Sequence, residues 1–149
     1  MGLTPVPLTA ARVATPGGAT PRLEYDVTLY STGPVRVWVH LSPRNNVLPT
    51  RAAASEGLKY AISFDDETPQ ERNIQVLTGA DDNGMNNAWG RNTGDNATRV
   101  YSEHTIDAPG LHTLKFWMVD PTVVLQKIVV DTGGLRDSYF GPPESAFVP

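Results

Sequence analysis

The sequence predicts an all-β fold, an antiparallel β-sandwich or jelly roll. Apolar and polar residues alternate with period two in several short runs, and turn-forming residues separate these runs. The 149 residues include 13 Gly and 13 Pro, which favour short strands and turns over long helices. No stretch carries apolar residues at helical spacing over the roughly 12 residues that a helix prediction needs.

The first two predicted strands, residues 23–30 and 35–41, flank a turn at Ser31–Pro34. In each strand the odd-numbered residues are apolar and are expected to face the core, whereas the even-numbered residues face outward. Trp38 is therefore expected to point outward, between Arg36 and His40. Two alternating runs around a short turn predict an antiparallel hairpin.

Five further strands are predicted at residues 58–64, 70–77, 99–106, 111–119 and 123–130. We expect the last two to pair with each other across the break at Asp120-Pro121. Residues 78–98 are rich in Asn, Asp and Gly, and a loop of that length in a compact domain is usually functional or disordered. The predicted domain organisation is an N-terminal arm or linker over residues 1–21 and one sandwich domain over residues 22–149.

Composition excludes several classes of function. The formal net charge is −4 and Lys and Arg do not cluster, which argues against nucleic-acid binding. No apolar run approaches the roughly 18 residues of a membrane-spanning helix, so no membrane partner is expected. The absence of Cys excludes disulfides, thiolate metal sites and cysteine nucleophiles.

The last third of the chain resembles a known family. The segments that carry the resemblance are Gly110–Pro121, Val123–Leu135 and Ser138–Ser145, supported by Leu41–Pro43 and Leu58–Gln70. Over roughly residues 22–145 they resemble the C-terminal domain of glycoside hydrolase family 115, the xylan α-1,2-glucuronidases. The resemblance implies a β-sandwich, of the galactose-binding-like kind, appended to a larger secreted or periplasmic enzyme that removes (4-O-methyl)glucuronic acid from glucuronoxylan.

The family's catalytic residues lie in domains that this sequence does not include, so the resemblance implies no catalytic residue here and a chain that is not itself an enzyme. One hypothesis is a carbohydrate-binding module that recognises plant cell-wall xylan or glucuronoxylan and is linked to a glycoside hydrolase catalytic domain. The alternative is a structural accessory domain that completes an active site or a dimer interface without sugar affinity. A free-standing hydrolase of polysaccharide or ester is a third, weaker hypothesis.

Sugar recognition has the best support from the residues themselves. A pyranose ring presents an apolar face to Trp or Tyr and hydroxyl edges to Asn, Asp or Arg. The outward face of strand 35–41 and the loop around Trp89 both offer such side chains, and either Arg36 or Arg91 is suited to a uronic-acid carboxylate. The predicted carbohydrate-binding residues are Trp89, Asn87, Arg91, Asn92, Trp38, Arg36 and Tyr101.

Each aromatic residue also has a structural interpretation. Trp38 would instead pack under the N-terminal arm, and Trp89 would anchor its long loop to the body of the domain. Trp117 alternates with the core-facing residues of its strand, and we expect it to be structural.

Catalytic and metal-binding patterns are weak. The adjacent Asp65, Asp66 and Glu67 fit a solvated acidic turn better than the spaced carboxylate pair of a glycosidase. No Gly-x-Ser-x-Gly motif is present, and His112 is expected to be a core or strand-end residue. No cofactor is predicted, but a structural calcium stays open, with ligands drawn from Asp81, Asp82, Asn83, Asp95 and Asp131.

Overall fold

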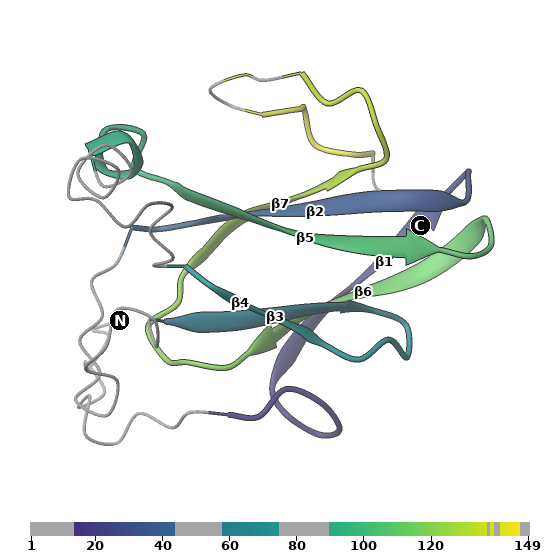
Figure 1. Ribbon diagram of the computed structural model, residues 1–149, viewed down its shortest axis with the longest axis horizontal. Helices are drawn as coiled ribbons and strands as arrows, with labels where there is room; N and C mark the ends of the chain where they lie inside the picture. Colours follow the sequence, from purple (N-terminus) through teal and green to yellow (C-terminus); the bar gives the residue numbers. More distant parts are fainter. Residues whose placement is uncertain (1–13, 44–57, 75–89, 137, 139–140, 147–149) are drawn as a thin grey trace.

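Seven strands form two antiparallel sheets that pack face to face in the computed structural model, which describes residues 14–43, 58–74, 90–136, 138 and 141–146 (Figure 1). Sheet A has the order β1-β6-β3-β4, and sheet B has the order β5-β2-β7. The strands are β1 (Arg22–Leu29), β2 (Gly33–Leu41), β3 (Lys59–Phe64), β4 (Gln70–Asn73), β5 (Thr98–Ile106), β6 (Gly110–Met118) and β7 (Leu125–Asp131). The predicted all-β sandwich is confirmed.

The core lies between the two sheets and is built from alternate residues of the central strands. Its main members, each at most 7% exposed, are Val35, Val37, Val39, Leu41, Tyr60, Ile62, Phe64, Leu114 and Phe116. Burial of this apolar area is the main stabilising contribution to the fold. The predicted inward face of β2 is confirmed, and the even-numbered residues of β2 point away from the core.

The predicted hairpin between the first two strands is wrong. β1 pairs with β6 from Arg22 opposite Trp117 to Leu29 opposite Gly110, whereas β2 pairs with β5 and β7. The short connection between β1 and β2 passes from one sheet to the other and ends at Gly33, whose φ of 120° suits glycine. The alternation of apolar and polar residues shows which side chains of a strand face the core. It does not show whether two consecutive strands pair in a hairpin or pass from one sheet to the other.

The expected pairing of the last two strands is wrong for the same reason. β6 pairs with β1 and β3 in sheet A, and β7 pairs with β2 in sheet B. The predicted fourth strand is shorter than expected, because β4 ends at Asn73, and residues 75–77 of the prediction lie outside the described part. A helix at residues 90–94, which was not predicted, begins and ends at glycine, a poor helix former.

Residues 14–21 are attached to the end of β6, in sheet A. The Ala14 amide donates to the Val119 carbonyl at 2.7 Å, and the Arg22 guanidinium lies 4.8 Å from the centroid of the Trp117 ring. The Trp117 indole is 5% exposed and donates to Ser63 Oγ at 2.8 Å. These contacts agree with the structural role predicted for Trp117.

Candidate functional site

Sheet B turns one face away from the core, and the register of its strands arranges that face in three cross-strand rows. The first row is Glu103, Arg36 and Asp131, the second is Tyr101, Trp38 and Val129, and the third is Arg99, His40 and Lys127. Each row takes one residue from β5, one from β2 and one from β7, in that order. We call these nine residues the outer face of sheet B.

The middle row contains an aromatic pair. The rings of Trp38 and Tyr101 are directly opposite each other on β2 and β5, with centroids 4.8 Å apart and planes tilted by 45°. Tyr101 is 42% exposed and Trp38 is partly exposed. Tilted aromatic pairs at this separation attract each other. The pair therefore forms an apolar patch that a solute can reach from solvent.

Arg36 adds a charge beside this pair. Its guanidinium lies 5.3 Å from the centroid of the Tyr101 ring, and its Nε donates to Glu103 Oε1 at 3.0 Å. The hydrogen bond to Glu103 and its negative charge raise the pKa of Arg36, which stays cationic. Within the described residues, the two Nη groups of Arg36 form no hydrogen bond, so they are available to a polar ligand.

The third row is a row of bases. Burial, followed by repulsion from Arg99 and Lys127, lowers the pKa of His40. Arg99 Nη2 lies 3.3 Å from Asp95 Oδ2, and Lys127 Nζ donates to the Pro142 carbonyl at 2.7 Å. The row thus carries two permanent positive charges, both held by neighbours.

The C-terminal tail runs along one side of this face (Figure 1). Val129 points outward but is only 6% exposed, and it lines a small cavity together with Gly134, Leu135 and Pro142. The described part of the N-terminal arm, residues 14–21, lies against sheet A instead, and residues 1–13 are outside the described part. The Trp38 indole N–H is covered and has no hydrogen-bond partner in the described chain.

The structure brings together three of the seven predicted site residues, Arg36, Trp38 and Tyr101. Arg91 and Asn92 lie in the short helix at residues 90–94, before β5. Their backbone carbonyls accept from Asp95 and Ala97, and no described hydrogen bond or ring contact joins them to the other three. The predictions for Asn87 and Trp89 fall outside the described residues.

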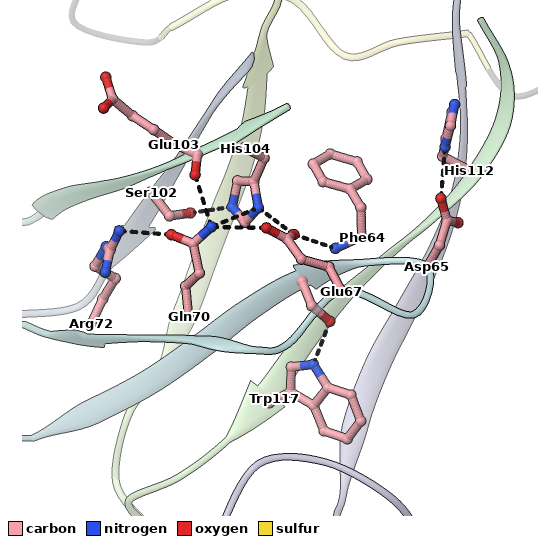
Figure 2. A network of polar contacts seen from close by, with 11 residues as sticks. Phe64, Asp65, Glu67, Gln70, Arg72, Ser102, Glu103, His104, His112 and Trp117 are labelled. Atoms are coloured by element: carbon pink, nitrogen blue, oxygen red, sulfur yellow. Dashed lines mark hydrogen bonds and ion pairs between the residues drawn. The ribbon is translucent and has the colours of Figure 1, made fainter. Parts of the chain in front are cut away.

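A buried polar network lies between the sheets on the other side of β5 (Figure 2). Ser102 Oγ is 2.7 Å from His104 Nε2, and His104 Nδ1 is 2.6 Å from Glu67 Oε2. The order of serine, histidine and carboxylate matches a hydrolase triad, but Ser102 is fully buried and no substrate carbonyl reaches it. We interpret the network as structural. Sequence reasoning missed it, although Ser102 and His104 are polar residues at two consecutive core-facing positions.

An acidic cleft of about 1010 Å³ opens at one end of the sandwich, lined by Asp65, Asp66, Glu67 and Asp107, among other residues. Asp65 adopts a φ of 43°, which is unusual for a residue other than glycine. Its carboxylate accepts from the Thr113 amide at 2.8 Å and from His112 Nδ1 at 2.7 Å, and Lys115 donates to its carbonyl. The predicted acidic turn is therefore present, but Asp65 is held by β6 and is not simply solvated.

Electrostatics do not favour Asp65 as an acid catalyst. Burial alone would raise the pKa of Asp65, but the hydrogen bonds from Thr113 and His112 hold it below its ordinary value. The hydrogen bond with Asp65, followed by that with the Ala108 carbonyl, raises the pKa of His112. Because a glycosidase acid needs a raised carboxyl pKa, Asp65 is unsuited to that role.

The described residues contain no group of three or more His, Asp or Glu side chains that fits a metal ion. Among the residues considered for calcium, Asp95 pairs with Arg99 and Asp131 accepts from the Gly133 amide, while Asp81, Asp82 and Asn83 lie outside the described part. No helix in the described ranges is long and apolar enough to cross a membrane.

The fold and the outer face of sheet B define a β-sandwich with an accessible aromatic surface. Residues 1–144 match the model of the glycosyl hydrolase family 115 C-terminal domain, and the chain belongs to that family. A similar solved structure is BtGH115A, a family 115 enzyme described as a 4-O-methyl-α-glucuronidase with specificity for decorated arabinogalactans. The TM-score is 0.60 at 18% identity, over 76% of this chain and 13% of that chain. No curated protein matches.

Proposed function

We propose that this domain is a non-catalytic carbohydrate-binding module that recognises plant cell-wall xylan or glucuronoxylan through the outer face of sheet B. The observation that carries the proposal is the partly exposed pair of Trp38 and Tyr101 with Arg36 beside it. The aromatic patch is suited to the apolar face of a pyranose. The Nη groups of Arg36, which form no hydrogen bond within the described part of the chain, are suited to its hydroxyls or to a carboxylate.

The wider setting follows from the family. The chain spans 13% of the solved relative, so a glycoside hydrolase catalytic part is the expected covalent partner. Such an enzyme acts on extracellular polysaccharide, so the domain is secreted or periplasmic in this proposal. In this proposal the chemistry belongs to the partner. Among the described residues, Ser102 is fully buried and Asp65 is held by hydrogen bonds, so neither is suited to act as a nucleophile or an acid.

Isothermal titration of the chain with glucuronoxylan, arabinoxylan and xylo-oligosaccharides tests the proposal. The expected result is that the wild type binds at least one xylan with measurable heat. Trp38→Ala should lower the affinity for that xylan more than about tenfold, the size of loss typical of a central aromatic contact. The matched control is Tyr30→Ala, because Tyr30 is 91% exposed but lies in the connection between β1 and β2. A well-folded wild type without heat for any xylan would sink the proposal.

Two further arms of the same titration test the predictions for the loop around Trp89 and for calcium, which involve residues outside the described part. Trp89→Ala reports whether the loop around Trp89 contributes to binding, alone or together with the outer face of sheet B. Repetition in EDTA reports whether binding depends on calcium.

The structural accessory domain is the second candidate, and β1 favours it. Leu23 and Tyr25 lie opposite Phe116 and Leu114 on the core side of sheet A, yet they are 49% and 42% exposed. β1 is an edge strand, so these side chains have a neighbouring strand on one side only. Self-association of the wild type in sedimentation velocity, abolished by Tyr25→Ser, together with no xylan heat, would favour this candidate.

A further inference from the structure

β4 and β5 are edge strands of different sheets, and side chains rather than a backbone ladder join them. Gln70 Nε2 donates to the Glu103 carbonyl at 2.8 Å, and Arg72 Nε donates to the Tyr101 carbonyl at 3.1 Å. Both carbonyls belong to β5, and their residues alternate with Ser102, which faces the core. The free edge of β5 is thus bonded by two long side chains from the opposite sheet.

The two donors are themselves fixed. Gln70 Oε1 accepts from Arg72 Nη2 at 2.9 Å, and Gln70 Nε2 also donates to Glu67 Oε1 at 3.0 Å (Figure 2). Glu67 in turn accepts from the Phe64 amide at 3.2 Å and contacts His104. Because every polar end has a partner, the network has one preferred arrangement.

The network reaches β5 from two directions. At its core face, His104 and Ser102 are held by Glu67. At its edge, the carbonyls of Tyr101 and Glu103 are held by Arg72 and Gln70. The side chains of Tyr101 and Glu103 leave the strand on the opposite side, where they contact Trp38 and Arg36.

We infer that Gln70 and Arg72 are positioning residues for the outer face of sheet B. They touch no ligand on that face but fix the backbone of β5, and so the position of Tyr101 against Trp38 and of Glu103 against Arg36. The inference rests on the proposed function, since it concerns the geometry of the proposed sugar site.

The test compares Gln70→Met and Arg72→Met with the wild type and with Glu71→Gln. Glu71 is the control because it lies between the two on β4 but points to the other side of sheet A, where it pairs with Lys59 at 3.3 Å. Xylan affinity is measured by titration at a temperature where circular dichroism shows each variant fully folded. Amide hydrogen exchange of residues 98–106 is followed by mass spectrometry.

Each Met variant is expected to lose about fivefold in xylan affinity, the equivalent of one net hydrogen bond, and to exchange faster over residues 98–106. Arg72→Lys retains a cationic donor and should recover part of the xylan affinity and part of the protection from exchange. Glu71→Gln should change neither the affinity nor the exchange rate. A wild type that binds no xylan would overturn the proposed function and the positioning role with it. Wild-type binding that both Met variants retain would overturn the inference alone.

Discussion

Two tryptophans on outward faces of the sandwich have opposite environments. Trp117 on β6 lies beneath the Arg22 guanidinium, is 5% exposed and donates its indole N–H to Ser63. Trp38 on β2 is partly exposed, contacts Tyr101, and has an indole N–H without a partner in the described residues. The alternation of a strand decides which face a side chain takes, but only the surrounding chain decides whether that face is covered.

The comparison divides the molecule by role. Sheet A packs its outer tryptophan against Arg22 of β1 and bonds it to Ser63 of β3, which is a contribution to folding. Sheet B leaves its outer tryptophan within reach of solvent, next to a cation and a second ring, which is an arrangement suited to recognition.

The largest expected effect is a difference in the stability lost when each of the two tryptophans is replaced by alanine. Trp117→Ala should lower the free energy of unfolding by about 3–5 kcal/mol, because it leaves a cavity and removes the hydrogen bond that the indole N–H donates to Ser63 Oγ. Trp38→Ala should lower it by less than Trp117→Ala does, because Trp38 is partly exposed and its indole N–H has no hydrogen-bond partner among the described residues. Urea unfolding followed by far-UV circular dichroism measures both. Equal losses would contradict the comparison and indicate that Trp38 is as much a part of the core as Trp117.

A smaller effect concerns the hydrogen bond of the Trp117 indole, which has no counterpart at Trp38 among the described residues. Ser63 is fully buried, so Ser63→Ala should cost about 1–3 kcal/mol by leaving the Trp117 N–H without an acceptor. In a Trp117→Phe background the same change should cost much less, because no N–H remains to be satisfied. A double-mutant cycle by urea unfolding gives the coupling energy, and additive losses would show that the hydrogen bond contributes nothing.

The smallest effect contrasts one histidine from each sheet by pH. NMR titration should give His112, next to Asp65, a pKa above 6.5 and His40, between Arg99 and Lys127, a pKa below 6.5. His112 therefore contributes stability that is complete below its unfolded pKa and is lost as the pH rises through its folded pKa. His40 contributes stability that is present above its unfolded pKa and is lost as the pH falls through its folded pKa.

Asp65→Asn is the control for this titration. It should return the pKa of His112 toward its ordinary value and leave that of His40 unchanged, because Asp65 contacts β6 and not sheet B. The opposite order of the two histidine pKa values in the wild type would be incompatible with the two environments described here.

Much of the fold was predictable because alternation is a local property. The runs around Val37 and Leu114 gave the strands and their core faces correctly. Pairing partners were not predictable, because the short link between β1 and β2 is equally compatible with a hairpin and with a crossing between sheets. The helix at residues 90–94 escaped prediction because one turn is too short for helical periodicity.

The site was predictable only in part, because alternation is local whereas the register between strands is not. Outward alternation identified Arg36 and Trp38, and Tyr101 was predicted as a sugar-binding residue without a face assigned to it. The assembly of the three depends on the register between β2 and β5. The role of Gln70 and Arg72 depends on two sheets meeting at their edges, and nothing local to β4 signals it.

The bonded edge of β5 has a consequence for solubility. An edge strand with free carbonyl and amide groups is a template for pairing with another molecule, and natural sheets block such edges. On β5 the carbonyls of Tyr101 and Glu103 are already occupied by side chains of β4, so an incoming strand finds two acceptors taken and the bulk of Arg72 in its path. The Gln70 and Arg72 side chains that hold β5 should therefore also disfavour strand pairing at this one edge of sheet B.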